Sequence, residues 1–474
     1  MSIAGTGIFE QKSFLISGTH SGVGKTTASF ILMSLLKKSG FNVQPFKHGP
    51  DFIDPGYHRL ATGKESINLD QWMMDHHQIQ DAFKTVRQQG DVGIVEGMGA
   101  VFDGENGTRK GSDAELSSIL SIPTILVVDI SGMTQSINAV LQGFFDYDPH
   151  LQIIGIIFNR AGSQKHYEMV ENSLLPRFKS LSLGYLLRSD LINIPERHLG
   201  LLTLEENDSM AERCKPYLEI AQKTLKLDYL TKALESAETL PNSIQGQKPH
   251  IRPQVRIGIA KDQAFCFYYK LNLLALEDAG AELVYFSPLQ DASLPEDIDG
   301  IYLGGGYPEN FGKELSQNPL TKQILREAIS GMPIYAECGG FIYLCQDLQY
   351  ENHLSYPMAG VFPYTIRWDK NYLAIKYVKI KTSIKSILGP VGVDIRGQEF
   401  HQTRVIDSNH YHENTCYMVT SSAGECFSEG YVKYNVLGSY MHLYFPSNPN
   451  IAENFVRSCK KYQNEKTCLS NAKN

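Results

Sequence analysis

The 474-residue sequence has few cysteines and no apolar run long enough to cross a membrane. Its eight cysteines include no pair at CxxC spacing, which excludes a disulfide scaffold and favours buried thiols. The longest apolar runs, at residues 122–130 and 153–158, fall far short of the roughly 20 residues that span a bilayer, and they indicate buried strands. Residues 1–18 also lack the charged and apolar segments of a secretory signal, so we expect a cytoplasmic protein.

An excess of positive charge is missing as well. The chain carries 44 basic and 51 acidic residues, a formal net charge of -7, which argues against a protein that coats nucleic acid with a basic face. Hydrophobic residues make up 42% of the chain, so a wholly disordered or fibrous protein is excluded too. Since a domain usually has about 100 to 200 residues, the length predicts a globular protein with two or more domains.

Strand-like and helix-like segments alternate in the N-terminal half of the chain. Short runs rich in Val, Ile and Phe are separated by amphipathic segments such as residues 26–39. This alternation predicts a parallel sheet covered by helices. The expected strands are residues 13–17, 43–46, 92–95, 124–129 and 153–158.

The C-terminal half repeats the α/β pattern after a polar, proline-bearing segment. We expect strands at 255–260, 283–286, 300–303 and 334–336, a helix at 271–279, and an antiparallel extension between about residues 360 and 434. The sequence therefore predicts two α/β domains joined by a linker. The predicted bounds are a first domain at 1–235, a linker at 236–254, a second domain at 255–463 and a polar tail at 464–474.

A glycine-rich loop directly after the first strand predicts a phosphate site. Its sequence is GTHSGVGKTT, with Thr19 where the first glycine of GxxxxGK[ST] is expected, and a helix follows it. The backbone amides of such a turn and the helix N-terminus form an anion cradle, which a nucleotide can fill. Lys25 would reach the outer phosphates and Thr26 would hold Mg²⁺. The expected nucleotide-binding residues of the loop are Gly22, Gly24, Lys25, Thr26 and Thr27.

Polar residues end several neighbouring strands of the first domain. Asp51 and Asp54 lie in a loop with Gly and Pro, and Glu96 ends the strand VGIVE. Because the carboxyl ends of parallel strands meet at one edge, these acids can face the phosphate loop and a cation. We expect Mg²⁺ at Thr26, Asp51 and Glu96, and nucleotide contacts from Asp51, Asp54 and Asn159. Turn formation and helix capping remain alternatives for the two aspartates, and loop capping remains one for Asn159.

A second candidate site centres on Cys338 in the segment MPIYAECGG. A strand leads into this cysteine, two glycines follow, and residues 341–348 are expected to form a helix. Such a turn exposes a nucleophile, lowers its thiol pKa at a helix N-terminus and offers backbone N–H groups to an oxyanion. We expect those donors at Gly339 and, in the loop LGGGYPE, at Gly305. A buried structural cysteine is the alternative, and Cys345 is expected to be one.

A thiol nucleophile requires a base, and His442 in GSYMHLYFP is the best candidate. His401 in RGQEFHQT is the competing candidate. In class I glutaminases a third catalytic residue lies two positions after the histidine, where this chain has Tyr444. His410 and His412 lack a third ligand at a recognisable spacing, which favours a solvated loop over a zinc site.

Nine motifs, in order across both domains, resemble those of the cobyrinic acid a,c-diamide synthase family. The resemblance runs from about residue 13 to residue 450, and nine ordered motifs are far more specific than any single one. The phosphate loop of this family has the same GTxxxVGKT form, so the spacing at Thr19 agrees with nucleotide binding. The motifs are GTHSGVGKTT, PFKHGPDFIDPGYH, NLDQWMM, VEGMGAVFDG, IPERHLGL, LGGGYPE, AECGGFIYL, RGQEFH and SYMHLYFPSNP.

The resemblance implies a fold and an activity. It implies an N-terminal ATP-binding domain like dethiobiotin synthetase, at residues 1–235, and a C-terminal domain like class I glutaminases, at 255–463. The implied enzyme is a glutamine-hydrolysing carbon–nitrogen ligase of cobalamin biosynthesis. It would amidate the a- and c-acetate carboxylates of cobyrinic acid with glutamine or ammonia, through acyl phosphates made with MgATP. Asp51 and Asp54 would help to bind nucleotide, metal and the reacting intermediate.

Other activities remain open at this stage. Close relatives carry out the same a,c-diamidation on hydrogenobyrinic acid or on Ni-sirohydrochlorin, a coenzyme F430 precursor, and the motifs do not separate these macrocycles. Cobyric acid synthase is disfavoured by GPDFIDPGYH and IPERHLGL, and a switch ATPase by His20 in place of a signature lysine. The expected cofactors are ATP and Mg²⁺, and the expected partners are a tetrapyrrole acid, glutamine and ATP. No nucleic acid or membrane is expected, and a homodimer is left open.

Overall fold

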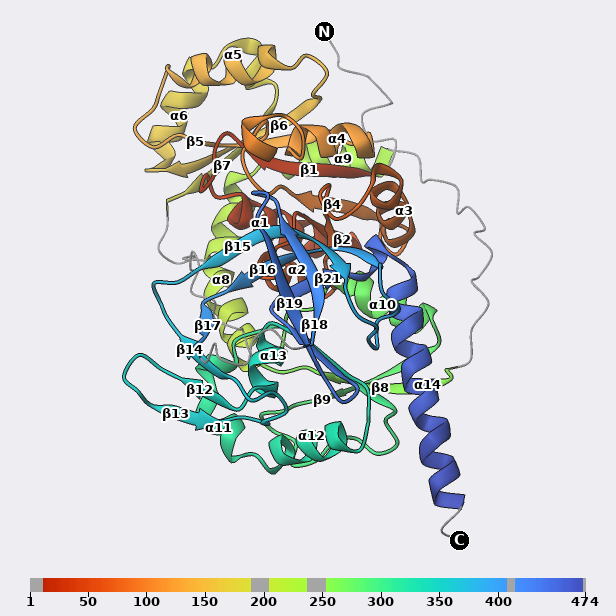
Figure 1. The fold of residues 1–474 in the computed structure, drawn as a ribbon. Coiled ribbons are helices and arrows are strands. Elements are labelled where there is room, and N and C mark those ends of the chain that lie inside the picture. Colours follow the sequence, from red (N-terminus) through yellow and green to blue (C-terminus); the bar gives the residue numbers. More distant parts are fainter. Residues whose placement is uncertain (1–11, 189–203, 237–252, 407–413, 472–474) are drawn as a thin grey trace. The chain divides into compact units, whose positions relative to one another are not determined.

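The protein consists of two compact units, Met1–Gln247 and Lys248–Asn474. The structure, a computed structural model, describes residues 12–188, 204–236, 253–406 and 414–471 (Figure 1). Most of the predicted linker, His410, His412 and the segment IPERHLGL lie outside the described residues. None of the described helices has the length and apolar character needed to cross a membrane.

The first unit is built on a parallel sheet, as predicted. Its strands run in the order β3-β2-β4-β1-β5-β6-β7, and every neighbouring pair is parallel. The carboxyl ends of all its strands therefore lie along one edge. The strands are β1 (Ser13–Gly18), β2 (Val43–His48), β3 (Ile67–Leu69), β4 (Val92–Glu96), β5 (Thr124–Asp129), β6 (Ile153–Ala161) and β7 (Ser182–Leu187).

Helices cover both faces of this sheet because its strands carry apolar side chains on both faces. Ile125 and Val127 of β5 pack in one hydrophobic cluster with side chains of α1, α8 and α9. Leu126 and Val128 point the other way, into a cluster with α5 and α6. The helices of this unit are α1 (Lys25–Lys38), α2 (Asp54–Thr62), α3 (His76–Arg87), α4 (Asp113–Leu120), α5 (Ile137–Tyr147), α6 (Gln164–Ser173), α7 (Pro176–Lys179), α8 (Leu204–Thr224) and α9 (Leu227–Ser236).

The second unit contains a ten-stranded mixed sheet in the order β21-β16-β15-β18-β19-β20-β11-β10-β8-β9. Its strands from β20 to β9 are parallel, and those from β21 to β20 are antiparallel, which confirms the expected antiparallel extension. The strands are β8 (Val255–Ala260), β9 (Ala281–Phe286), β10 (Gly300–Leu303), β11 (Ile334–Glu337), β15 (Ala374–Thr382), β16 (Asp394–His401), β18 (Thr415–Ser421), β19 (Cys426–Lys433), β20 (Val436–Ser439) and β21 (Met441–Tyr444).

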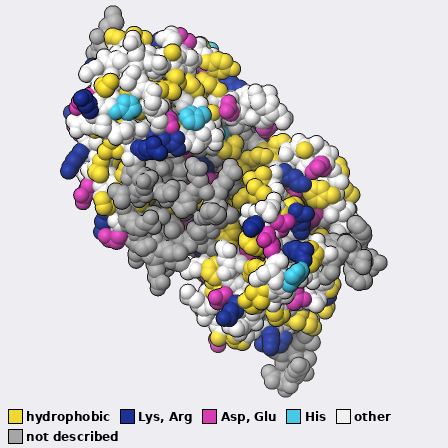
Figure 2. Space-filling view, turned by 90° about the vertical axis from the view of Figure 1, so that its left-hand side faces the viewer, with side chains coloured by type: hydrophobic (Ala, Val, Ile, Leu, Met, Phe, Trp, Pro, Cys, Tyr) yellow, Lys and Arg dark blue, Asp and Glu magenta, His cyan; other side chains and the backbone are white. Residues whose placement is uncertain are grey.

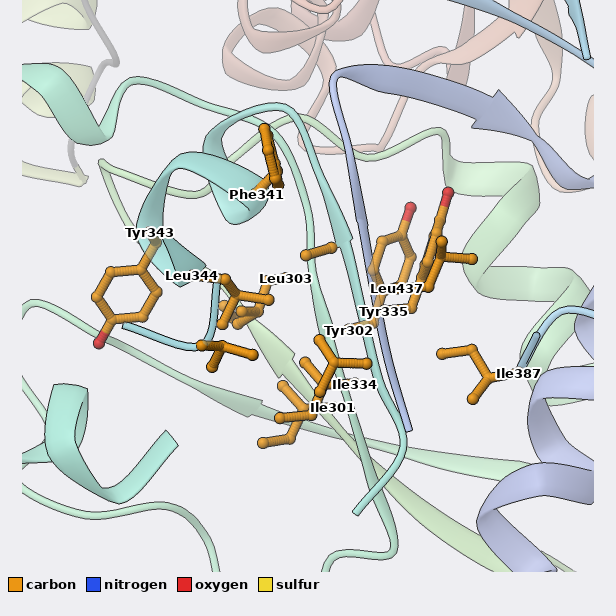
Figure 3. Close-up of a cluster of buried hydrophobic side chains, with 14 of the residues drawn as sticks. Ile301, Tyr302, Leu303, Ile334, Tyr335, Phe341, Tyr343, Leu344, Ile387 and Leu437 are labelled. Atoms are coloured by element: carbon orange, nitrogen blue, oxygen red, sulfur yellow. The ribbon is translucent and has the colours of Figure 1, made fainter. Parts of the chain in front are cut away.

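The core of the second unit lies around its central strands (Figure 3). Ile301 of β10 stands beside Ile334 of β11 in the register, and both are fully buried. Phe341 and Leu344 of α13 pack in the same cluster. The helices are α10 (Lys270–Asp278), α11 (Gly312–Gln317), α12 (Pro319–Ile329), α13 (Gly339–Leu344) and α14 (Asn450–Asn471).

One local prediction was wrong. The helix expected at residues 341–348 ends at Leu344, because Asp347–Gln349 forms β12 in a four-stranded sheet with β13 (Ser355–Pro357), β14 (Thr365–Trp368) and β17 (Thr403–Val405). The polar tail expected from residue 464 continues α14 as far as Asn471. Burial of Ile451 and Phe455 anchors the first turns of that helix, which then extends into a polar segment.

The surface carries charges of both signs. On the described face shown in Figure 2, Lys and Arg side chains are interspersed with Asp and Glu side chains. This distribution agrees with the small net charge of the chain.

Candidate active sites

The phosphate loop of the first unit lies between β1 and α1, at the carboxyl edge of the sheet. Gly22 and Gly24 adopt left-handed conformations, with φ of 77° and 96°, that side chains disfavour. Gly24 caps α1, so Lys25 begins the helix and is only 7% exposed. Lys25, Thr26 and Thr27 thus form the first helical turn, where free amides favour an anion.

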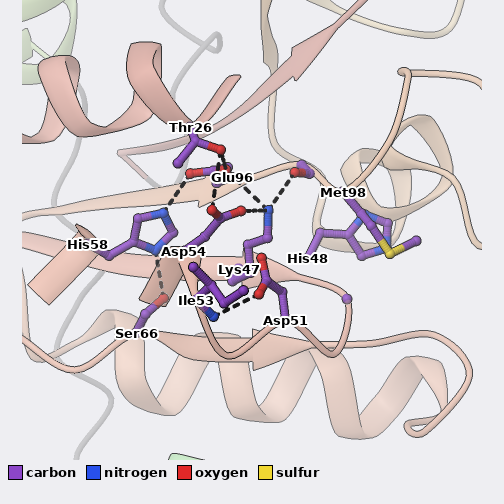
Figure 4. Close-up of polar contacts among 12 residues, drawn as sticks. Thr26, Lys47, His48, Asp51, Ile53, Asp54, His58, Ser66, Glu96 and Met98 are labelled. Atoms are coloured by element: carbon purple, nitrogen blue, oxygen red, sulfur yellow. Dashed lines mark hydrogen bonds and ion pairs between the residues drawn. The ribbon is translucent and has the colours of Figure 1, made fainter. Parts of the chain in front are cut away.

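A polar cluster faces the start of this helix (Figure 4). The Thr26 hydroxyl donates to Glu96 at 2.9 Å and to Asp54 at 3.3 Å. The Lys47 ammonium lies 2.6 Å from Asp54 and 3.1 Å from Glu96. His58 approaches the other oxygen of Glu96, Oε2, at 2.7 Å. Two carboxylates, a hydroxyl and an ammonium therefore converge beside the phosphate loop.

The charges of this cluster depend on one another. Burial would lower the pKa of Lys47, but Asp54 and Glu96 outweigh burial and raise that pKa above its ordinary value. Burial would likewise raise the pKa of Asp54, but Lys47 lowers it below its ordinary value. The pKa of Asp51 is raised, first by burial and then by the charge of Asp54. Lys47 and Asp54 are therefore an ion pair at neutral pH.

Other predicted residues make structural contacts. Asp51 follows the turn-forming alternative, since its carboxylate accepts the N–H of Ile53 at 2.7 Å. Asp54 is the first residue of α2, but its carboxylate pairs with Lys47 and not with a backbone N–H of the helix. The amide of Asn159 donates to the carbonyl of Val23 at 2.8 Å and so supports the phosphate loop.

Sequence analysis missed four members of the first site: Lys47, His48, His58 and Asp113. A lysine and a histidine in succession at the end of an apolar strand, in FKHGPD, were the available signal for the first two. Asp113 gave no signal, since it begins α4 far along the chain. Its carboxylate nevertheless binds His48 Nδ1 at 2.5 Å and the Ser17 hydroxyl at 2.5 Å, which ties α4 to β1 and β2.

In the second unit, Cys338 occupies a strained turn between β11 and α13. Its φ of 45° and ψ of -101° lie outside the regions that side chains favour. A Cβ on Gly340 would lie 2.3 Å from the backbone oxygen of Leu303, so the turn depends on glycine there. The N–H of Cys338 donates to the carbonyl of Ser439 at 2.7 Å. The predicted nucleophile turn is therefore present in the structure.

The thiol of Cys338 is nearly inaccessible, with 3% exposure, and donates to the carbonyl of Phe400 at 3.3 Å. Burial raises its pKa well above the ordinary value, and the charge of Glu309 adds to the rise. A hydrogen bond from the Gly339 N–H opposes both, without reversing them. The thiol is therefore neutral in this state, and a base must take its proton for it to react.

His442 of β21 lies at the same point of the fold. Its ring is fully buried, and its Cε1 is 2.4 Å from where a Gly305 Cβ would stand. Burial and the charge of nearby His401 lower the pKa of His442 to about 3, and the backbone of Phe400 opposes them only weakly. The carbonyl of Phe400 accepts the thiol, and the same backbone segment influences the pKa of the imidazole, so the two groups lie in one part of the site. The imidazole is neutral and keeps a lone pair for a proton.

Glu337 holds these two residues in place. It ends β11 directly before Cys338, is 1% exposed, and accepts hydrogen bonds from Tyr302 at 2.9 Å and Tyr335 at 2.5 Å. It also accepts the N–H of Leu443 at 3.0 Å, the residue after His442. A single buried carboxylate thus links the strand before the thiol to the strand that carries the imidazole.

The predicted oxyanion donors differ in their availability. The N–H of Gly339 lowers the pKa of the Cys338 thiol and so lies beside the reacting atom. The N–H of Gly305 donates instead to Phe267 at 3.2 Å, whereas the backbone N of Gly306 lies 3.0 Å from where a Gly339 Cβ would stand. The geometry therefore favours Gly306 over Gly305 as the second donor.

The remaining candidates have structural roles. His401 accepts or donates through both ring nitrogens, to Thr403 at 2.8 Å and Glu399 at 2.8 Å, and stacks on Tyr440. It is therefore less suited than His442 to serve as the base. Cys345 is fully buried at the end of α13, in agreement with a core role.

Comparison with known proteins identifies the two kinds of domain. The CobQ/CobB/MinD/ParA nucleotide binding domain family matches residues 14–202, and the CobB/CobQ-like glutamine amidotransferase domain family matches residues 256–450. A cobyrinate a,c-diamide synthase of Dehalococcoides mccartyi is 38% identical over 459 residues, covering 94% of this chain and 98% of its own. The chain belongs to the cobyrinate a,c-diamide synthase family.

Two further relatives with the same name come from other organisms. The protein of Picrophilus torridus is 39% identical over 451 residues, covering 94% of this chain and 98% of its own. That of Priestia megaterium is 35% identical over 457 residues, covering 96% and 98%. The family predicted from the nine motifs, the α/β fold class and the class of glutamine-dependent ligase are thus confirmed.

The ion pair in the first site gives a stability prediction. We expect Lys47→Met to lower the free energy of unfolding of the first unit by about 3–5 kcal/mol, because it leaves buried carboxylates without their cation. Urea unfolding followed by Trp72 fluorescence in a Trp368→Phe background reports on this unit, since the chain has two tryptophans. Exposed Lys84→Met is the control and should change little.

The loss of stability caused by Lys47→Met should depend on pH. The folded pKa of Asp54 is lowered, so its stabilising pairing with Lys47 is present above an unfolded pKa near 3.8 and is lost as the pH falls. The difference between the two proteins should therefore be largest near pH 7 and shrink below pH 4. An equal difference at both pH values would contradict the assigned ion pair.

Glu337 gives a second stability prediction. Tyr335→Phe removes one donor from its buried carboxylate and should lower the free energy of unfolding of the second unit by about 1–3 kcal/mol. The pKa of Glu337 is raised to about 7 by burial, above its unfolded value, so stability falls as the pH rises toward 7 and beyond. The ionised form needs the donor most, so the loss should be larger at pH 8 than at pH 5.

Trp368 fluorescence in a Trp72→Phe background measures this unit. Tyr462→Phe, whose hydroxyl contacts Ser330 at 3.3 Å at the surface, is the matched control. A pH-independent loss, or a loss equal to that of the control, would show that Glu337 does not depend on the tyrosine.

Proposed function

We propose that this protein amidates the a- and c-acetate carboxylates of cobyrinic acid, with ATP and with glutamine or ammonia as nitrogen donor. The observation that carries the proposal is the presence in one chain of two different reaction sites. One is a phosphate loop facing Lys47, Asp54 and Glu96, and the other is a cysteine turn facing His442. Relatives named cobyrinate a,c-diamide synthase, aligned over 94% or more of the chain, suggest the substrate.

In the glutaminase half of the reaction, Cys338 Sγ attacks the side-chain amide carbon of glutamine. His442 takes the thiol proton and returns it to the departing nitrogen, which leaves as ammonia. The N–H groups of Gly339 and Gly306 stabilise the oxyanion, with the Gly305 loop supporting the ring of His442. Water then hydrolyses the thioester and releases glutamate.

In the synthetase half, the substrate carboxylate attacks the terminal phosphorus of ATP, so that ADP leaves and an acyl phosphate forms. Ammonia then attacks the acyl carbon, and phosphate leaves in place of the poor oxide leaving group. Gly22, Gly24, Lys25, Thr26 and Thr27 would hold the phosphates. Lys47, held between Asp54 and Glu96, can stabilise the negative charge of the acyl phosphate.

The first site suits Mg²⁺ as a companion of ATP. Among the described residues, no group of three or more His, Cys, Asp or Glu side chains forms a ready metal site. Mg²⁺ usually takes only one or two protein carboxylates and completes its coordination with phosphates and water. The Thr26 hydroxyl and the Glu96 carboxylate, whose oxygens are 2.9 Å apart, could supply such protein ligands. Asp51 and Asp54 belong to the same cluster of charges. When bound, the ion would neutralise phosphate charge.

Asn159 remains a proposed nucleotide contact whose amide also supports the loop. Because ATP, glutamine and corrin precursors are cytoplasmic compounds, we propose the cytoplasm as the site of the reaction. Hydrogenobyrinic acid and Ni-sirohydrochlorin are outcomes of the substrate test that follows.

The substrate test offers the purified chain cobyrinic acid, its a,c-diamide, hydrogenobyrinic acid and Ni-sirohydrochlorin, each with glutamine and MgATP. Mass spectrometry then counts the amides gained, because each carboxylate converted to an amide lowers the mass by about one unit. We expect two amidations of cobyrinic acid and none of the diamide. Amidation of the diamide alone would show that the protein acts later, on other side chains of the ring.

Cys338→Ser tests the division of labour between the two sites. We expect glutamine-dependent amidation to fall at least a hundredfold while amidation with added ammonia is retained, because only the first step of nitrogen release requires the thiol. Cys345→Ser, in the buried neighbour at the end of α13, is the control and should keep both activities. Loss of both activities in a folded Cys338→Ser protein would contradict the proposed roles.

A further inference from the structure

One carboxylate beside the thiol has no assigned task. Glu309 lies in the short 3-10 helix Pro308–Asn310, at the end of the loop LGGGYPE. This loop packs against the cysteine turn, since a Gly339 Cβ would lie 2.9 Å from Pro308 and 3.0 Å from the backbone N of Gly306. The loop that carries Glu309 is therefore part of the site, and the charge of Glu309 acts on Cys338.

The Glu309 carboxylate is held without a cation. Its Oε2 is buried and has no hydrogen-bond partner, and among the described residues no lysine, arginine or histidine forms an ion pair with it. Burial raises its pKa to about 7. Tyr350 donates to the backbone oxygen of Glu309 at 2.5 Å and so fixes the main chain rather than the carboxylate. A carboxylate oxygen that is buried without a partner is unfavourable unless a ligand supplies that partner.

The position of Glu309 also works against the thiol. Its negative charge is the largest cause after burial of the raised pKa of Cys338. A negative charge beside a nucleophile that reacts as thiolate slows the reaction, unless a bound cation neutralises it. The proposed substrate carries such a cation, because glutamine has an α-ammonium group besides its amide and α-carboxylate.

We propose that Glu309 binds the α-ammonium group of glutamine and that this pairing activates Cys338. The inference rests on the proposed function and adds the residue that selects the nitrogen donor. In the empty site the carboxylate suppresses the thiolate, and in the occupied site the ammonium cancels the charge. Glutamine would thereby increase the reactivity of the thiol that attacks it, while other electrophiles would meet a poorly reactive thiol.

The first test compares two nitrogen donors. The quantity measured is the ammonia that the full-length protein releases from each. Glutamine and glutaramate, which is glutamine without its α-amino group, are assayed with the wild type and with Glu309→Gln. The wild type should prefer glutamine through a lower KM. Glu309→Gln should raise the KM for glutamine by about ten- to a hundredfold and leave that for glutaramate nearly unchanged, because only glutamine loses a charged partner.

Glu314→Gln is the matched control, since Glu314 is an exposed carboxylate five residues further along. It should leave both KM values as they are. Equal KM increases for both donors in Glu309→Gln would assign Glu309 a merely structural role and overturn the proposal, as would an unchanged KM for glutamine. If the wild type hydrolyses no glutamine at all, the proposed function fails instead, and amidation with added ammonia shows whether the chain is folded.

The second test measures the thiol directly. Purified protein without substrate is treated with iodoacetamide over a range of pH, and alkylation of Cys338 is quantified by peptide mass, which separates it from exposed Cys426 and Cys468. Glu309→Gln should be alkylated several-fold faster than the wild type at pH 8, where Glu309 is ionised. A rate equal to or below that of the wild type would contradict the electrostatic coupling between Glu309 and the thiol.

Discussion

Each unit depends on a buried glutamate that ends a central parallel strand and must find donors in several other elements. In the first unit Glu96 ends β4 and is contacted by Thr26 of α1, Lys47 of β2 and His58 of α2. In the second, Glu337 ends β11 and joins Tyr302 of β10 to the backbone of β21. A buried carboxylate without such partners costs several kcal/mol, so these elements are constrained to meet where the chemistry takes place.

The same constraint explains which parts of the structure could be predicted. Strands and the two glycine turns follow from local sequence, since apolar periodicity and a glycine beside a close backbone contact are encoded within a few residues. The partners of Glu96 are not, because Lys47 and His58 come from separate elements and only the strand order of the sheet brings them together. Asp113 shows the limit most clearly, as a helix-start aspartate whose role appears only when β1 and β2 lie beside it.

Some polar residues and glycines make contacts that the sequence did not indicate, and the reasons are physical. Asp51 and Asp54 look alike in GPDFIDPG, but the chain turns after Asp51, so a nearby N–H captures its carboxylate, while Asp54 faces Lys47. Gly305 and Gly306 are adjacent glycines of one loop, yet the bond to Phe267 occupies the amide of the first. Neighbouring residues of one type can have different roles when the backbone turns them in different directions. Composition and spacing do not reveal that direction.

Burial gives the second site a resting state that is poorly reactive. A thiol with a raised pKa and an imidazole with a lowered one are both neutral, so the thiolate–imidazolium pair forms only when the surroundings change. An enzyme that hydrolyses glutamine without an acceptor wastes it, and a neutral resting pair limits that loss. Glu309 extends the same logic from burial to charge, since a substrate that brings its own cation is the one molecule that both fills the site and removes the charge opposing the thiolate.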